Sequence, residues 1–448
     1  MLKQKIPTFF LIISLLIFSY ALYKSEIHWE GHKRSYYIVY YLLSFVLGLF
    51  SIALFFVNQI IKEYFLISLI SVIFGLYLFE GYQTTKAKLN YNIAPKEKLR
   101  KIKLYEKQTG KKYDTRTKSE IYKDLKKVAS NITVSYLPFA NVGNETEILP
   151  LSGVSNIKTI MCNENGYFAI YNSDRYGFNN PDKEWEQNEI EYLLVGDSMT
   201  MGHCVNRPDD FASNLRILSN KSALNLGMGG NGPLIEYATL REYLGLNVKK
   251  VIWFYDENTD LYNLSKELKN PILNNYLTDN KFSQNLIFNQ NKVDTFALNF
   301  INKTIQEIEV QKPKTSIKKF IKMNEVRSIL NKLLPIKYQP NQDKPNLYNE
   351  FEIILQLAND LITKNKSKLY FVFIPHNNRF SSKNEYDNSN YFSIKKIVRN
   401  LNITFIDLKD ILEKKDNPMK YYPFGMDGHF SEVGYRDITN IIYNYIEK

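Results

Sequence analysis

A serine and a histidine that lie far apart in the sequence are the residues best suited to do chemistry. Ser198 follows the apolar run 192–195, which ends abruptly in Gly-Asp-Ser. Such an ending is typical of a buried strand that leads through a tight turn into a helix, and sites of open α/β sheets form at the carboxyl ends of strands. A serine hydroxyl there becomes a nucleophile when a histidine takes its proton. His429 is the expected proton acceptor, with Asp427 as the carboxylate that orients its ring.

A glycine-rich loop, 227–233, follows a short apolar stretch and precedes a helical pattern. Glycines let the backbone approach a ligand closely and point N–H groups at it, so the loop can bind an oxyanion. The loop lacks the Gly-Lys-Ser/Thr of a phosphate loop, and Gly-Asp-Ser stands where a dinucleotide-binding loop would be. A third polar group, 256–260, follows another apolar run and adds side chains at the same expected edge.

Taken in order, these blocks resemble the SGNH (GDSL-type) esterase/lipase superfamily over about residues 191–448, apart from an insertion. The resemblance implies that Ser198 is the nucleophile and a backbone oxyanion donor, that Gly230 is a second donor, and that His429 is the general base. It implies a hydrolase acting on ester bonds through an acyl-enzyme, without a metal or an organic cofactor. If a sugar hydroxyl replaces water as the acceptor, the same residues perform O-acyl transfer.

Two positions depart from the family pattern. The third block usually reads Gly-x-Asn-Asp, but Thr259 occupies the place of the asparagine, so Asn258 or the hydroxyl of Thr259 is the candidate third oxyanion donor. The family aspartate commonly precedes the histidine by three residues, where this chain has Met426, whereas Asp427 precedes it by two. Losing one oxyanion donor typically costs ~10²–10³ in rate. A catalytically weak binding or scaffold protein of the cell envelope with the same fold is therefore the alternative hypothesis.

The elements that must position these residues alternate regularly from residue 191 onward. This rhythm predicts an α/β fold: a three-layer, doubly wound parallel sheet of the flavodoxin-like, SGNH hydrolase type, with right-handed crossovers. The segment 262–346 interrupts the rhythm and is too long for an ordinary connection, so it is either a helical cap, a partner surface or a polar excursion. The predicted strands are 192–195, 223–226, 250–255, 369–374 and 403–407, and the predicted helices are 209–218, 233–246, 351–363, 393–401 and 433–446.

The N-terminal region is apolar and predicts two to three membrane helices within residues 1–82, from runs at 6–23, 36–58 and 64–79. The third run is short, because a bilayer core needs ~20 helical residues. The first run resembles a signal peptide, but the absence of a small-x-small cleavage site favours a retained anchor. A basic connector, 83–130, and a small β-containing extension, 131–190, are predicted to precede the catalytic domain at 191–448.

Charge and cysteine content bound the partners. The net charge is +12, and much of the excess lies in 86–127, which we interpret as a solvated basic face beside a membrane. No groove-reading motif for nucleic acid is present. Cys162 and Cys204 either form a disulfide outside the cytoplasm or are two separate thiols. We expect an ester-bearing small molecule, glycan or lipid as substrate, and a bacterial inner-membrane location with a periplasmic catalytic domain, although the lysines after residue 79 argue for the opposite orientation.

Overall fold

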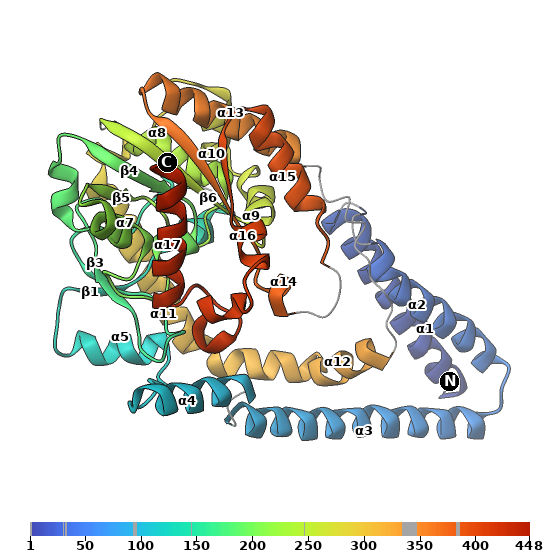
Figure 1. Cartoon of the computed structure of the whole chain (residues 1–448). Coiled ribbons are helices and arrows are strands. Elements are labelled where there is room, and N and C mark those ends of the chain that lie inside the picture. Colours follow the sequence, from blue (N-terminus) through green and yellow to red (C-terminus); the bar gives the residue numbers. More distant parts are fainter. Residues whose placement is uncertain are drawn as a thin grey trace. The chain divides into compact units, whose positions relative to one another are not determined.

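The computed structural model describes residues 2–29, 31, 34–92, 96–144, 146–245, 247–333, 347–381 and 386–448. Two compact units make up the chain. One contains residues 1–95 and 309–344, and the other contains residues 96–308 and 345–448. Figure 1 shows the N-terminal helices of the first unit in blue and the sheet of the second in green to orange-red.

The first unit is built from long apolar helices. Three segments are long and apolar enough to cross a membrane, namely Lys5–His28, Tyr36–Phe55 and Gln59–Thr85. Small residues join the first two helices, since Ser14 Oγ donates to the carbonyl of Ser44 at 2.7 Å, as is common where membrane helices pack closely. The helices are α1 (Leu2–Leu22), η1 (Tyr23–His28), α2 (Arg34–Phe55) and α3 (Gln59–Asn92).

The last described helix of the predicted insertion belongs to this first unit. Helix α12 (Asn324–Leu333) packs against α3. The carboxylate of Glu80 accepts hydrogen bonds from the backbone N–H groups of Glu325, at 3.1 Å, and Val326, at 2.9 Å. These are first-turn donors that lack a partner within their own helix, so Glu80 caps α12. Residues 334–346 of the predicted insertion lie outside the described residues.

A five-stranded parallel sheet forms the centre of the second unit, in the order β5-β4-β6-β7-β8. The five strands predicted from the apolar runs are confirmed. This order places β4, which leads to Ser198, between β5 and β6, where the order of the strands reverses and sites of α/β sheets form. The strands are β4 (Ile190–Val195), β5 (Ala223–Asn225), β6 (Val248–Asp256), β7 (Lys368–Ile374) and β8 (Thr404–Asp407).

Helices cover both faces of this sheet, so the unit has three layers (Figure 1). Successive strand residues point to opposite faces: Leu193 joins one hydrophobic cluster and Leu194 the other. One face carries α8 (Pro233–Tyr243), α13 (Tyr348–Lys364) and α15 (Ser389–Asn400), and the other carries α7 (Phe211–Ser219), α16 (Leu408–Glu413) and α17 (Glu432–Ile446). All five predicted helices are present within a few residues of their predicted bounds, as α7, α8, α13, α15 and α17.

The segment before the sheet is part of the same unit. Its small second sheet has the order β1-β2-β3, and the middle strand of that sheet was not predicted. Asn180 then pairs with the edge strand β5, because its amide donates to the carbonyl of Asn225 at 2.9 Å and accepts from the N–H of Asn225 at 2.8 Å. The elements are α4 (Lys96–Thr109), α5 (Lys118–Lys126), β1 (Ile132–Val134), β2 (Lys158–Ile160) and β3 (Ile170–Asn172).

The first part of the predicted insertion is helical and packs on the core. Leu273 and Val293 are fully buried in the hydrophobic cluster on the α8 face. Further along, Ala297 and Ile301 form a smaller cluster with Tyr136 of the extension. These described residues support the core and the extension. The helices are α9 (Asp260–Glu267), α10 (Pro271–Thr278) and the first half of α11 (Gln290–Ile321).

A close backbone contact between Gly153 and Gly177 fixes the fold of the extension. Gly177 has φ +87°, and a Cβ added there would lie 2.1 Å from the carbonyl oxygen of Gly153. We expect Gly177→Ala to lower the free energy of unfolding by about 2 kcal/mol or more, since both the left-handed backbone and the clash are unfavourable. Thermal unfolding in detergent measures the effect. Gly143→Ala is the control, because nothing lies within 4 Å of its added Cβ; equal melting temperatures for the two variants would contradict the prediction.

Candidate active site

The turn that presents Ser198 is tightly constrained. Strand β4 ends at Val195, and the short helix α6 (Ser198–Met201) begins at the serine. Gly196 is required between them, because a Cβ added there would lie 2.1 Å from Thr200 Oγ1. Asp197 caps α6, its carboxylate accepting the N–H of Met199 at 2.8 Å. The serine hydroxyl is thereby held, partly exposed, at the carboxyl edge of the sheet.

His429 reaches this serine from the other end of the domain. Its Nε2 lies 2.9 Å from Ser198 Oγ. The loop that carries it precedes α17, whose first turn is capped by Ser431, with the Ser431 hydroxyl accepting the N–H of Gly434 at 3.1 Å. The capped helix and the turn therefore fix the two side chains within hydrogen-bonding distance, as a nucleophile and a base require.

The carboxylate that orients His429 is that of Glu164. Its Oε1 lies 3.0 Å from His429 Nδ1, and its Oε2 accepts the backbone N–H of His429 at 2.7 Å. Both carboxylate oxygens thus contact the same residue. Since Nδ1 carries the proton in this hydrogen bond, Nε2 is left free to accept the serine proton.

Asp427 does not occupy the position that the sequence spacing suggested. Its side chain accepts a hydrogen bond from Asn377, and its carbonyl oxygen accepts one from Lys101 Nζ at 3.0 Å. The space beside Nδ1 is already filled by Glu164, which approaches so closely that a Cβ at Gly428 would lie 2.7 Å from its Oε2. The assignment of the orienting carboxylate therefore changes from Asp427 to Glu164.

The pairing of Glu164 with His429 sets the protonation of both groups. Burial alone would raise the pKa of Glu164, but the hydrogen bond and the charge of His429 outweigh it and lower that pKa to about 2. Burial alone would lower the pKa of His429, but the hydrogen bond and charge of Glu164 raise it above the ordinary value. Glu164 is therefore ionised at neutral pH and stabilises the imidazolium form of His429.

A disulfide joins the segment of Glu164 to the segment of the nucleophile. Cys162, two residues before Glu164, is bonded to Cys204, which settles the alternatives left open by the sequence. Asn165 adds a second link, since its amide donates to the carbonyl of Cys204 at 2.9 Å. The acid comes from outside the five-stranded sheet, and these two links hold it beside the nucleophile turn.

His203 lies beside the base without taking its place. Its ring packs edge-on against that of His429, with 4.6 Å between the centroids. Burial, and then the charge of His429, lowers the pKa of His203 well below its ordinary value. It is therefore a neutral neighbour. His376 lies elsewhere in the unit and contacts the hydroxyl of Tyr386 through Nδ1 at 3.1 Å.

Two groups of side chains near the base lie close enough together to hold a metal ion. In the described part of the chain they are Cys162 with His203 and Cys204, and Glu164 with Cys204 and His429. Both groups depend on a cysteine sulfur, and both sulfurs are bonded to each other. They offer no thiolate, which is the form of cysteine that binds metals.

The glycine loop lies next to the nucleophile. A Cβ added at Gly229 would lie 3.8 Å from Ser198 Cβ, and Gly230 has φ +80°. In the described structure the backbone N–H groups of Ser198 and Gly230 donate to no acceptor. Unpaired N–H groups beside a nucleophile are the arrangement that binds a developing oxyanion.

Helix α9 holds this loop in place. Asn263 donates to the carbonyl of Gly230 at 3.0 Å. The carboxylate of Glu267 accepts the N–H of Gly232 at 2.6 Å and that of Leu234 at 3.0 Å, at the start of α8. The break in the βαβ rhythm thus begins with a helix that supports the glycine loop.

In the third block, Thr259 shares a hydrogen-bond partner with Ser198. Thr259 Oγ1 lies 3.4 Å from Asp197 Oδ2, and Ser198 Oγ lies 3.4 Å from the same oxygen. Asn258 is exposed, and no hydrogen bond to its side-chain amide is found in the described structure. The threonine hydroxyl is therefore held near the serine, whereas the asparagine amide is not fixed.

Behind the nucleophile, buried acids face one another. Burial raises the pKa of Asp197, and burial together with the charge of Asp197 raises that of Asp256 to about 7. Asp256 accepts the N–H of Asn258 at 2.7 Å and that of Thr259 at 3.1 Å. This carboxyl group shapes the turn of the third block.

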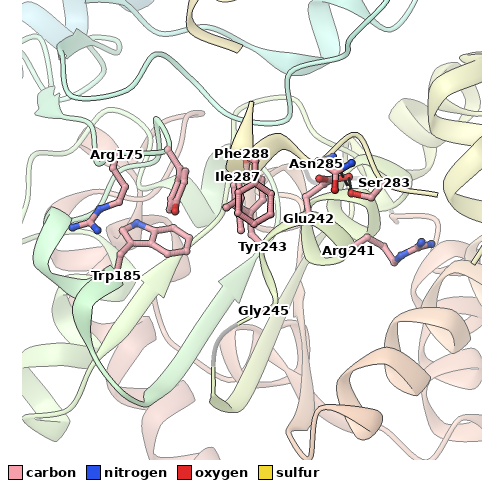
Figure 2. Close-up of a pocket in the computed structure, with 11 residues that line it drawn as sticks. Arg175, Trp185, Arg241, Glu242, Tyr243, Gly245, Ser283, Asn285, Ile287 and Phe288 are labelled. Atoms are coloured by element: carbon pink, nitrogen blue, oxygen red, sulfur yellow. Dashed lines mark hydrogen bonds between the residues drawn. The ribbon is translucent and has the colours of Figure 1, made fainter. Parts of the chain in front are cut away.

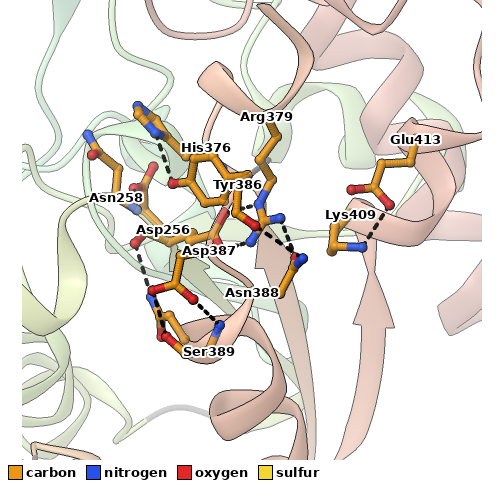
Figure 3. Close-up of polar contacts among 12 residues, drawn as sticks. Asp256, Asn258, His376, Arg379, Tyr386, Asp387, Asn388, Ser389, Lys409 and Glu413 are labelled. Carbon is orange, nitrogen blue, oxygen red and sulfur yellow. Dashed lines mark hydrogen bonds and ion pairs between the residues drawn. The ribbon is translucent and has the colours of Figure 1, made fainter. Parts of the chain in front are cut away.

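A polar network forms the rim of the site at the ends of β6 and β7 (Figure 3). Glu257 pairs with Arg379, and their side chains are only 2% and 3% exposed. The Arg379 guanidinium stacks on Tyr386, 4.1 Å from the ring centroid. Glu257 also accepts the N–H of His376 at 3.0 Å. The loop after β7, whose Asn377 contacts Asp427, is thereby joined to the turn after β6.

A cavity of about 480 Å³ lies at the other end of α8. Figure 2 shows it lined by Trp185, Tyr243 and Phe288 together with Arg175 and Arg241. Helix α8 starts beside the glycine loop and ends at Tyr243, so this cavity lies about 16 Å of helix away from the site. It shares no lining residue with Ser198 and His429, and it is a separate feature.

Sequence reasoning missed Glu164, and one signal could have found it. The sequence pattern predicts an acid close to His429 in sequence, namely Asp427, whereas Glu164 lies in the extension. Cys162 and Cys204 were the clue, because a disulfide between them would place Glu164 within a few residues' reach of the nucleophile turn. The sequence alone does not decide whether two cysteines are bonded.

Comparisons with known proteins were made with the sequence and with the structure. No family model and no curated protein matches the chain. Among solved structures, the chain is similar to a Desulfitobacterium hafniense DCB-2 protein described as lipolytic and of the G-D-S-L family (12% identity, TM-score 0.30, covering 58% of this chain and 99% of that one). It is also similar to the acetyl xylan esterase AlAXEase (14% identity, TM-score 0.30, covering 57% of this chain and 100% of that one). A third similar structure is the Bacillus subtilis protein YXIM (9% identity, TM-score 0.31, covering 58% of this chain and 56% of that one). Similarity at these TM-scores carries no weight in assigning an activity to this chain.

Proposed function

We propose that this chain is a membrane-anchored serine esterase with an SGNH-type doubly wound catalytic domain. The observation that supports this most strongly is the continuous chain from Ser198 through His429 to Glu164, with contacts of 2.9 and 3.0 Å. A nucleophile, a base within reach of it and a third group that orients the base are the signature of covalent acyl transfer. The unpaired N–H groups of the glycine loop complete the set.

In the proposed mechanism, His429 Nε2 takes the proton of Ser198 as Oγ attacks the ester carbonyl. The N–H groups of Ser198 and Gly230 bind the oxyanion, aided by Thr259 or Asn258. The tetrahedral intermediate collapses, the C–O bond to the alcohol breaks, and the alcohol leaves with the proton from His429. Water, activated by the same histidine, then attacks the acyl-enzyme and releases the acid. A sugar hydroxyl in place of water would give O-acyl transfer.

The apolar helices and the disulfide support a substrate in the cell envelope. Three apolar helices precede the catalytic unit, and a disulfide next to the site is typical of proteins in an oxidising compartment such as the bacterial periplasm. We therefore propose that the chain is held in the inner membrane with its catalytic unit in the periplasm, and that the ester is part of an envelope glycan or lipid.

A second candidate function is favoured by one observation. Thr259 stands where the related pattern has asparagine, and the amide of Asn258 is not fixed by any hydrogen bond in the described structure. With one oxyanion donor weakened, the chain would be a catalytically feeble binding or scaffold protein of the same fold. Activity against a simple ester separates the two candidates.

We expect the full chain in detergent to hydrolyse p-nitrophenyl acetate and Ser198→Ala to lose about 10³-fold or more in kcat, because the nucleophile is removed. Release of p-nitrophenolate is the measurement. The matched control is Ser265→Ala, a half-buried serine on α9 whose hydroxyl donates to the carbonyl of Tyr262 and has no other hydrogen bond in the described structure. Equal rates for the wild type and Ser198→Ala would favour the scaffold function.

We expect Glu164→Gln to lower kcat/KM by about 10²–10⁴-fold, because the amide stabilises neither the correct tautomer nor the imidazolium. The pH profile provides a second readout. Glu164 raises the pKa of His429, and activity needs neutral His429, so activity rises as pH increases through that pKa. Removing the carboxylate should therefore move the acid limb of the profile to lower pH. Asp427→Asn is the comparison and should lose less than about tenfold; a larger loss there than in Glu164→Gln would restore Asp427 as the orienting acid.

Replacing both cysteines with serine should reduce kcat/KM by about tenfold or more, because the link between Glu164 and the nucleophile turn is lost while Asn165 still restrains the segment. Steady-state kinetics of the double variant Cys162→Ser/Cys204→Ser measures the effect, and circular dichroism confirms that the variant is folded. A folded variant with wild-type kinetics would show that the disulfide does not position the acid.

A further inference from the structure

Helices α4 and α5, from the stretch expected to be a solvated basic face, lie around the candidate site. On α4, Lys101 Nζ donates to the carbonyl of Asp427 at 3.0 Å, two residues before His429. Tyr105 of the same helix packs so closely on Gly166 that an added Cβ there would lie 2.3 Å from its ring. The basic stretch is thus joined to the loops that carry the base and the acid.

Lys118, at the start of α5, contacts the segment that borders Ser198. It is half-buried, and its Nζ lies 3.5 Å from Ser135 Oγ. Two residues further along that segment, Leu137 Cδ2 would lie 2.9 Å from a Cβ at Gly229, and Ser198 Cβ would lie 3.8 Å from the same position. The ammonium group therefore lies along the segment that borders the nucleophile.

Two further observations place Lys118 on the same side of the site as His203. The charge of Lys118 is one of the causes that lower the pKa of His203, after burial and the charge of His429. The N–H of Ser135, which Lys118 contacts, donates to the carbonyl of Ile160 at 2.9 Å, two residues before Cys162, and Cys162 is bonded to Cys204 next to His203. The ammonium group is on the His203 side of the site.

Lys118 is half-buried and has no counter-ion in the described part of the chain, unlike two basic residues near it. Arg116 pairs with Asp114 at 2.7 Å, and Lys127 pairs with Asp124 at 3.2 Å. For Lys118, no carboxylate in the described part of the chain comes within ion-pairing distance, and burial lowers its pKa. A partly desolvated cation without a counter-ion is unfavourable by itself and is stabilised when an anion binds.

We infer that the site takes esters of molecules that carry a carboxylate, and that Lys118 binds this carboxylate as a specificity-determining residue. The inference rests on the proposed esterase function and adds the class of substrate. Lys101 lies on the histidine side and adds positive potential, while Lys118 makes the contact. The reaction itself is unchanged, because the carboxylate remains on the substrate throughout.

The experiment compares acetate esters that differ in charge but little in shape. One pair is 4-acetoxybenzoate and 4-acetoxybenzamide; the second is 4-acetoxycinnamate and 4-acetoxycinnamamide, in which the charged group reaches farther. Using the full chain in detergent at low ionic strength, we expect kcat/KM to favour the carboxylate in at least one pair by about tenfold or more, as a charge-assisted contact would.

Three variants assign this preference. Lys118→Met should abolish most of the preference for the carboxylate, and Lys118→Arg should retain it. Lys126→Met is the matched control: it removes the same charge from the same helix at an exposed lysine whose Nζ contacts Tyr122. The inference is overturned if the wild type shows no preference in either pair, or if Lys118→Met keeps it.

Failure of the proposed function would look different. In that case neither member of any pair would be hydrolysed faster by the wild type than by Ser198→Ala. Binding then decides the inference about Lys118, through calorimetric titration of 4-acetoxybenzoate and 4-acetoxycinnamate into the wild type and Lys118→Met. Weaker binding to the variant supports the inference, whereas equal binding, or no binding to either protein, contradicts it.

Discussion

The double contact between Glu164 and His429 is the interaction on which the site depends. One oxygen holds the ring through Nδ1 at 3.0 Å and the other holds the backbone N–H at 2.7 Å. With both bonds made, the imidazole is fixed in tautomer and direction, and its Nε2 faces Ser198. Without these two bonds, the His429 side chain would have several rotamers available, and fixing it in one of them would cost conformational entropy.

This contact makes the site a joint product of two parts of the chain. The sheet supplies Ser198 and the glycine loop, and the extension supplies Glu164. The disulfide, the close approach of Gly153 and Gly177, and the pairing of Asn180 with β5 all serve to hold the extension on the sheet. The glycine loop is held in turn by Asn263 and Glu267 of α9. Residues far from Ser198 thus fix the geometry around it.

Much of this arrangement could be predicted from local pattern. The apolar runs that end in polar or glycine-rich turns gave all five strands of the parallel sheet, and the approach of His429 to Ser198 followed from the expectation that both lie at one sheet edge. Glu164 and Lys118 could not be found in this way, because their place depends on pairings between distant segments: a disulfide in one instance and the folding of a basic helix around the site in the other. Asp427 is close to His429 in sequence and was therefore the predicted orienting acid. Sequence distance does not determine which way a side chain points, and the side chain of Asp427 contacts Asn377.

The most direct measurement of the central claim is covalent labelling of the folded full chain with a fluorophosphonate, followed by peptide mass spectrometry. Such reagents react with serines whose hydroxyl is activated by a neighbouring base. We expect one major adduct on the peptide that contains Ser198, and its loss in His429→Ala. A folded chain in which Ser198 stays unlabelled, or is labelled equally well without His429, would contradict the claim that these two residues act together.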